Sequence, residues 1–138
     1  MSRTSVLHID FYSSIIINGI ESGWVNWGQV DNYNSGFNHS TGEQHEAYVE
    51  LYLDDPEYAV IPDSVRLADA LLTDGKVMVN IPSIVKALNK IINGDIKINP
   101  NLRDLCKEAK AEWDGGMLDA IACDVIIQVA VFDEIVYG

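Results

Sequence analysis

The stretch that decides the fold is Ile81–Gly94, IPSIVKALNKIING, which carries the signals of an amphipathic helix with both ends marked. Proline stands in its first turn, apolar residues recur every three or four positions, and a glycine follows the last of them. The segment 99–116, NPNLRDLCKEAKAEWDGG, repeats this arrangement with its own early proline. The sequence therefore predicts two helices, over about 82–93 and about 100–113.

Upstream of these helices the apolar residues follow a period of two, which is typical of half-buried strands. The alternation runs over 5–17 and is followed by Asn18-Gly19, a dipeptide that favours a type I′ turn. We therefore expect a β-hairpin at the N-terminus, with a second strand over about 20–30.

Three further segments complete the upstream elements. A strand is expected over 44–54, where the alternation returns, although a helix beginning at Thr41 is an alternative. Helical spacing predicts a helix over about 63–73. A short strand over 76–81 then leads into the helix at 82–93.

The C-terminal segment 117–137 fits either a buried helix or a buried strand, because it is strongly apolar. The density of β-branched residues after Asp124 favours a strand that returns to the N-terminal sheet. The whole sequence thus predicts one compact α+β domain over 1–138. In this predicted domain, an antiparallel hairpin or meander over about 5–54 packs against two to four helices.

Charge is the outstanding feature of the composition. The 138 residues carry a net charge of −12, which argues against a nucleic-acid binder because such proteins need a basic face. Residues 1–63 contain ten acids and one base, 64–113 six acids and eight bases, and 114–138 five acids and no base. The acidic excess is therefore concentrated in the N-terminal part of the chain.

Cysteines and targeting signals point to an ordinary cytoplasmic protein. The two cysteines, Cys106 and Cys123, stand in apolar-periodic stretches and are expected to be buried thiols. No signal peptide and no apolar run of membrane-spanning length is recognisable. We therefore expect a reducing, cytoplasmic location and no membrane association.

The strongest pattern is an ordered row of acids separated by tyrosines, which a strand over 44–54 would place on one face. Such a face attracts basic partners at long range and offers tyrosines as anchors, although a solvated strand face is the simpler explanation. The partner-binding residues predicted in this way are Glu43, Glu46, Tyr48, Glu50, Tyr52, Asp54, Asp55 and Glu57.

A second candidate site surrounds the polar loop 31–42, since long loops are disproportionately functional. Aromatic side chains in and before this loop could stack on a flat ring or a saccharide, unless they pack in the core. The ligand-loop candidates are Trp24, Trp27, Tyr33, Phe37 and His39. A metal or acid–base role for this region would require His8, Asp10, His39 and His45 to converge.

The sequence contains no nucleophile elbow, no phosphate-binding glycine loop and no metal motif, so no catalysis, cofactor or metal is expected. We therefore expect an acidic interaction module that binds a basic protein surface. A narrower form of this hypothesis is a nucleic-acid-mimicking inhibitor, because phage and mobile-element inhibitors of restriction or CRISPR complexes share this composition. The alternatives are a small enzyme or ligand-binding domain that uses the 31–42 loop and nearby histidines, and a self-associating assembly subunit.

Overall fold

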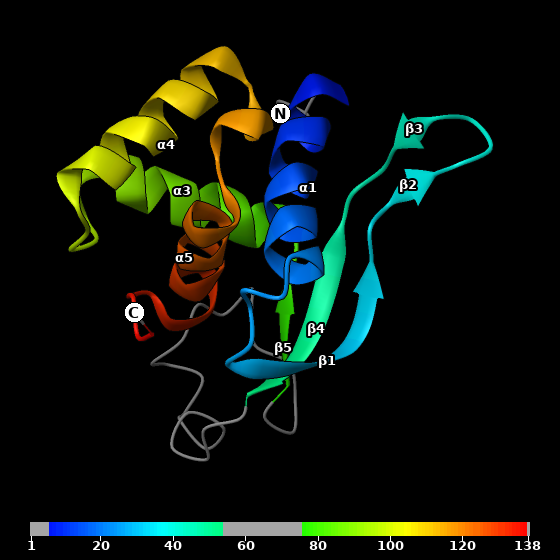
Figure 1. The fold of residues 1–138 in the computed structure, drawn as a ribbon, viewed down its shortest axis with the longest axis horizontal. Coiled ribbons are helices and arrows are strands. Elements are labelled where there is room, and N and C mark those ends of the chain that lie inside the picture. Colours follow the sequence, from blue (N-terminus) through cyan, green and yellow to red (C-terminus); the bar gives the residue numbers. More distant parts are fainter. Residues whose placement is uncertain (1–5, 54–75, 138) are drawn as a thin grey trace.

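The computed structural model describes residues 6–53 and 76–137, which form the predicted α+β fold (Figure 1). This part of the chain contains four α-helices, a three-stranded antiparallel sheet and a two-stranded ribbon. The predicted helix over 63–73 lies outside the described residues. The elements, in order, are α1 (Val6–Glu21), β1 (Gly28–Asn34), β2 (Phe37–Asn38), β3 (Glu43–Gln44), β4 (Tyr48–Leu53), β5 (Lys76–Val79), α3 (Ile81–Asn93), α4 (Pro100–Glu112), the 3₁₀-helix η2 (Gly115–Met117) and α5 (Ala120–Phe132).

The helix α1 lies between the other helices and the β2–β3 ribbon (Figure 1). The sheet has the strand order β1-β4-β5, and the buried side chains of β4 and β5 join a core shared with the helices. A register shift between Val30 and Asn32 marks a bulge in β1. The described core residues form one cluster from Phe11 to Phe132.

The predicted strand over 5–17 and the turn at Asn18-Gly19 are wrong, because α1 continues through both. Phe11, Ile15 and Gly19 are spaced four residues apart and are buried, as on one side of a helix. A Cβ on Gly19 would lie 2.5 Å from Ile127 Cδ1 of α5, so this glycine permits close approach of the two helices. Asn18-Gly19 therefore serves helix packing and not a turn.

The strand favoured after Asp124 is also wrong, because the helix α5 occupies Ala120–Phe132. Asp119 caps this helix by accepting a hydrogen bond from the Ala122 amide at 2.8 Å. The neighbours α1, α3 and β5 all contact α5, and most of its residues are buried. A helix surrounded in this way is apolar on every side and shows no helical stripe in its sequence.

The second strand expected over about 20–30 is also wrong in position, because α1 runs to Glu21 and β1 begins only at Gly28. Most of β1 and all of β2 lie in the segment expected to be the loop 31–42.

The other described elements agree with the sequence. The strand predicted over 44–54 is observed as β4, with β3 just before it, so the helix beginning at Thr41 is not formed. The short strand over 76–81 corresponds to β5, and the two capped helices correspond to α3 and α4. Within the described residues no helix is long and apolar enough to cross a membrane.

The N-terminus of α3 is fixed by a capping box. The Asn80 side chain accepts a hydrogen bond from the Ser83 amide at 3.1 Å, and the Ser83 hydroxyl lies 3.4 Å from the Asn80 amide nitrogen. We expect Asn80→Ala to lower the free energy of unfolding by about 1 kcal/mol, because the Ser83 amide loses its acceptor. Urea denaturation measures this loss. Asn80→Asp keeps an acceptor, so its free energy of unfolding should be much closer to that of the parent protein. Equal losses in the two variants would contradict the capping role.

Candidate partner-binding site

The predicted row of acids and tyrosines is present on β4 as far as the structure describes it. Tyr48, Glu50 and Tyr52 are half-buried or exposed, whereas the residues between them are buried in the core. Glu43 lies on β3 and Glu46 in the connection to β4, and both are exposed. Asp54, Asp55 and Glu57 lie outside the described residues.

A lysine on the neighbouring strand interrupts the acidic character of this face. Lys76 Nζ lies 3.2 Å from a Glu50 carboxylate oxygen and 3.1 Å from an Asp31 oxygen. Hydrogen bonds to Asp31 and Glu50 raise the pKa of Lys76, so this side chain stays charged beside them. The same ammonium lies 5.6 Å from the centre of the Tyr52 ring. On β4 the described part of the row therefore holds one carboxylate, Glu50, and that carboxylate is paired.

An acidic hollow lies instead between α1 and the β2–β3 ribbon. A cavity of about 600 Å³ is lined there by apolar atoms of Ile9, Ile17 and Phe37. Two carboxylates, Asp10 from α1 and Glu43 from β3, also line this cavity. Its lining therefore combines an apolar surface with negative charge.

A second cavity of about 540 Å³ continues along α1 on the side of η2. It shares Ser14 and Ile17 with the first cavity and includes Glu21 at the C-terminal end of the helix. We call the two cavities together the α1 trough. No lysine or arginine is among the described residues that line it. The α1 residues along its floor, spaced as one stripe of a helix, are Asp10, Ser14, Ile17, Asn18 and Glu21.

The ribbon that forms one wall of the trough is joined to α1 by a buried hydroxyl. Ser13 Oγ donates to the His45 carbonyl at 3.3 Å and accepts from the Ala47 amide at 3.1 Å. Ser13 is fully buried, and its hydrogen bond with Ala47 is shielded from water. The two arms of the ribbon are also joined to each other, because the Gly36 carbonyl accepts from the His45 amide at 2.8 Å.

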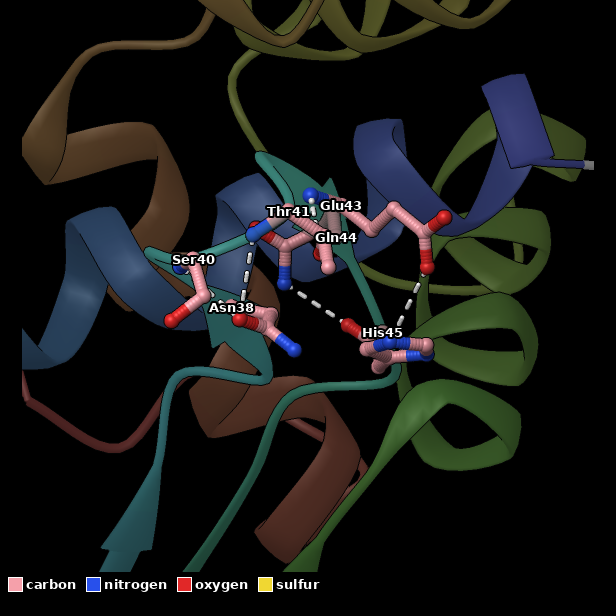
Figure 2. A network of polar contacts seen from close by, with 6 residues as sticks. All are labelled: Asn38, Ser40, Thr41, Glu43, Gln44 and His45. Atoms are coloured by element: carbon pink, nitrogen blue, oxygen red, sulfur yellow. Dashed lines mark hydrogen bonds and ion pairs between the residues drawn. The ribbon is translucent and has the colours of Figure 1, made fainter.

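The tip of the ribbon is held by side chains that bind its own backbone (Figure 2). Asn38 accepts from the Ser40 amide at 2.9 Å, and the Gln44 side-chain amide donates to the His45 carbonyl at 2.7 Å. Figure 2 also shows His45 close to Glu43, with 3.5 Å between Nε2 and the nearest carboxylate oxygen. These local bonds give the wall of the trough a defined shape.

The acid at the opposite end of the trough is held by a tyrosine of β1. The Tyr33 hydroxyl donates a hydrogen bond to the Glu21 carboxylate. Burial of Tyr33, and then its hydrogen bond to Glu21, raise the pKa of this phenol, which therefore remains a donor. Tyr33 thus orients a carboxylate and does not serve as a free stacking surface.

The three histidines do not converge. His45 lines the trough together with Asp10 and Phe37, but His39 packs edge-on against Phe37 at 4.9 Å between ring centres. His8 stacks on Trp113 of the helical part, with ring centres 3.6 Å apart. Among the described residues, no group of three or more His, Cys, Asp and Glu side chains could hold a metal ion.

The aromatic candidates near the 31–42 loop have different environments. Trp27 is 5% exposed and donates its indole N–H to Asp124 at 2.8 Å, so it packs in the core. Trp24 and Phe37 are 48% and 42% exposed, and Phe37 lines the trough. The predicted ligand-loop residues therefore do not form one surface.

Both cysteines are buried, as the sequence predicts. Burial raises the pKa of the Cys106 thiol to about 11 and that of the Cys123 thiol to about 12. Since the thiolate is the reactive form, neither side chain is an activated nucleophile.

Comparison with known protein families, with curated proteins and with solved structures finds no match to this chain. Its function must therefore be inferred from the site itself.

The stripe on α1 escaped the sequence analysis. The sequence pattern assigns no binding role to Ser14, Ile17, Asn18 or Glu21, and it offers Asp10 only as a partner for the histidines. The signal that could have found them is their spacing at steps of three and four residues. Assigning 5–17 to a strand concealed this helical pattern.

Proposed function

We propose that this protein is an acidic interaction module that binds a basic region of a partner protein through the α1 trough. The observation that carries the proposal is the α1 trough itself, whose described lining contains three acids, Asp10, Glu21 and Glu43, and neither lysine nor arginine. Residues 6–53 contain six acids and no lysine or arginine, so their field has one sign. Such a surface speeds association with positively charged partners and excludes acidic ones.

The broader proposal is preferred to nucleic-acid mimicry. A mimic requires a regular array of carboxylates, and the described part of β4 contributes only Glu50, which Lys76 pairs. The exposed carboxylates Asp10 and Glu21 lie on a helix instead. A phage-type inhibitor that mimics nucleic acid is a narrower form of the proposal. It would require further carboxylates in addition to Glu50 on the described part of β4.

Binding to fluorescent poly-lysine, followed by anisotropy, tests the proposal. Replacing the three trough acids together, as Asp10→Asn, Glu21→Gln and Glu43→Gln, should weaken binding about tenfold at low ionic strength, because three attractive charges are lost. The same loss should shrink as salt is raised from about 50 mM to about 300 mM, because salt screens exposed charges.

The matched control removes three exposed acids of α4, as Asp104→Asn, Glu108→Gln and Glu112→Gln. This variant has the same net charge as the trough variant and should bind within about twofold of the parent protein. Equal weakening in both variants would show that poly-lysine responds to net charge alone, and the proposal would fail. Absence of binding by the parent protein would have the same consequence.

A small-molecule site is the second candidate function, favoured by the convergence of Asp10, Phe37 and His45 on one cavity of about 600 Å³. Such cavities are the usual size of ligand sites. A fragment screen followed by nuclear magnetic resonance tests it. Two results together would favour this candidate over the interaction module. Fragments would shift the Phe37 and His45 resonances together, and Asp10→Asn, which removes one negative charge, would leave poly-lysine binding unchanged.

A further inference from the structure

We propose that the α1 trough binds an extended peptide segment with two basic residues about five positions apart and an apolar residue between them. This inference rests on the proposed function and names the kind of partner segment that the trough fits. Three features carry it: the length of the trough, its apolar centre, and the positions of its carboxylates.

The length follows from the helix that forms the floor. Asp10 lies in the second turn of α1 and lines the first cavity, and Glu21 ends the helix and lines the second, eleven residues further on. At about 1.5 Å of rise per residue, these positions are about 16 Å apart along the helix axis. An extended chain rises about 3.3 Å per residue, so about five residues cover the same distance. A short extended segment can therefore span both cavities.

The centre of the trough is apolar where the ends are charged. Ile17 lines both cavities, and Phe37 adds an aromatic wall that is 42% exposed. An apolar side chain inserted here would be removed from water against carbon atoms of both residues. This exposed apolar surface is continuous with the cavity of about 600 Å³. It therefore suits one aliphatic anchor of the segment.

The carboxylates define where the positive charges of the segment belong. Asp10 and Glu43 line the first cavity, where the Glu43 carboxylate also lies 3.5 Å from His45 Nε2, so a basic side chain would meet two acids and one imidazole there. Glu21 lines the second cavity, and the Tyr33 hydroxyl holds its carboxylate in place. An oriented carboxylate loses less freedom when it pairs with a cation. The charge complementarity thus requires a segment that is positive at both ends.

Each cavity has a wall beside the helix. Glu43, Gln44 and His45 of the ribbon side line the first cavity, and Gly115 and Gly116 of η2 line the second. A Cβ on Gly115 would lie 2.0 Å from Ser14 Oγ. The absence of a side chain at Gly115 therefore allows η2 to approach α1 closely. A segment lying along α1 would therefore contact the ribbon in the first cavity and η2 in the second.

Titration of the full-length protein with three short peptides tests the inference, with amide and methyl resonances as the readout. The peptide GKSLSSKG carries lysines at the required spacing with a central leucine. GKKSLSSG has the same composition with adjacent lysines, and GKSSSSKG lacks the leucine. We expect GKSLSSKG to bind at least about fivefold more tightly than either, and to shift Ile17 and Phe37 resonances.

Two variants complete the test. Asp10→Asn and Glu21→Gln should each weaken GKSLSSKG binding by about threefold to tenfold, whereas Glu112→Gln on α4 should leave it within about twofold. Equal affinities for the three peptides would overturn the inference. So would shifts confined to residues outside the trough.

The outcomes separate this inference from the proposed function. If poly-lysine binding depends on the trough acids but the peptides are not distinguished, the interaction module stands and the extended segment does not. Sedimentation addresses a further occupant, a second copy of the chain. A dimer that dissociates in the Asp10→Asn and Glu21→Gln variants would place that copy in the trough and overturn the peptide assignment.

Discussion

Gly36→Ala is expected to lower the free energy of unfolding by about 3 kcal/mol and to displace the ribbon that forms the trough wall. Gly36 has a φ of +74°, a conformation that costs about 1–2 kcal/mol for a residue with a Cβ. The added Cβ would also lie 2.3 Å from the His45 carbonyl oxygen, which belongs to the backbone and cannot rotate away. The His45–Gly36 backbone hydrogen bond would then be strained or lost.

Gly42→Ala is the matched control, because Gly42 has nearly the same φ, +75°, with no atom within 4 Å of the position of a Cβ. Only the conformational cost applies there, so Gly42→Ala should lower the free energy of unfolding by about 1 kcal/mol. Urea denaturation of the two variants measures the difference. If both lose the same free energy, contact with the His45 carbonyl is not what makes Gly36 necessary.

The elements that the sequence predicts correctly are those whose ends are marked locally. The helix α3 has Asn80 and an early proline at its start, and Gly94 in the left-handed conformation at its end. These signals act through hydrogen bonds within a few residues and need no knowledge of the rest of the fold. The alternation of β4 is equally local, because one of its faces is buried and the other is not.

The two helices that the sequence misassigns are those with apolar residues on several sides. In α1 the same isoleucines satisfy a period of two and a helical period, so the pattern does not discriminate. In α5 the β-branched residues favour a strand, yet contacts with α1 and α3 outweigh that preference. The deciding information is which neighbours surround the segment, and this is a property of the tertiary structure.

The same limit applies to the site. The sequence identifies an acidic N-terminal region, and Glu43, one of its predicted partner-binding residues, does line the trough. It does not show that Lys76 pairs Glu50, because these residues come from different strands. Asp10 and Glu21 become members of one stripe only when α1 is recognised as a helix. Errors in secondary structure therefore carry over into the assignment of functional residues.

Asp124→Ala is expected to lower the free energy of unfolding by about 3 kcal/mol, because it removes the acceptor from a buried indole. Asp124 is 8% exposed and accepts from Trp27 Nε1 at 2.8 Å and from Gln128 Nε2 at 2.9 Å. Gln128 in turn accepts from the Tyr137 amide at 2.8 Å. The carboxylate therefore connects the segment before β1, the helix α5 and the C-terminal segment in one hydrogen-bond network.

The loss should depend on pH in a defined direction. Burial raises the pKa of Asp124 above its ordinary value of 3.8, although hydrogen bonds from Trp27 and Gln128 oppose the shift. The folded protein then holds a proton at pH values where the unfolded chain has released it. The stability that this residue contributes is therefore fully present below pH 3.8 and is lost as pH rises through the folded-state pKa.

Urea denaturation of the parent protein and Asp124→Ala between about pH 3 and about pH 7 measures this dependence. The difference in unfolding free energy should be largest at the acidic end and should decrease as pH rises. Asp124→Asn provides the control, because its carbonyl can still accept from Trp27 while its amide nitrogen faces the Gln128 donor. We expect an intermediate loss of about 1–2 kcal/mol for this variant. A difference between the parent protein and Asp124→Ala that grows with pH would show that the native fold favours the ionised carboxylate, contrary to the effect expected from its burial.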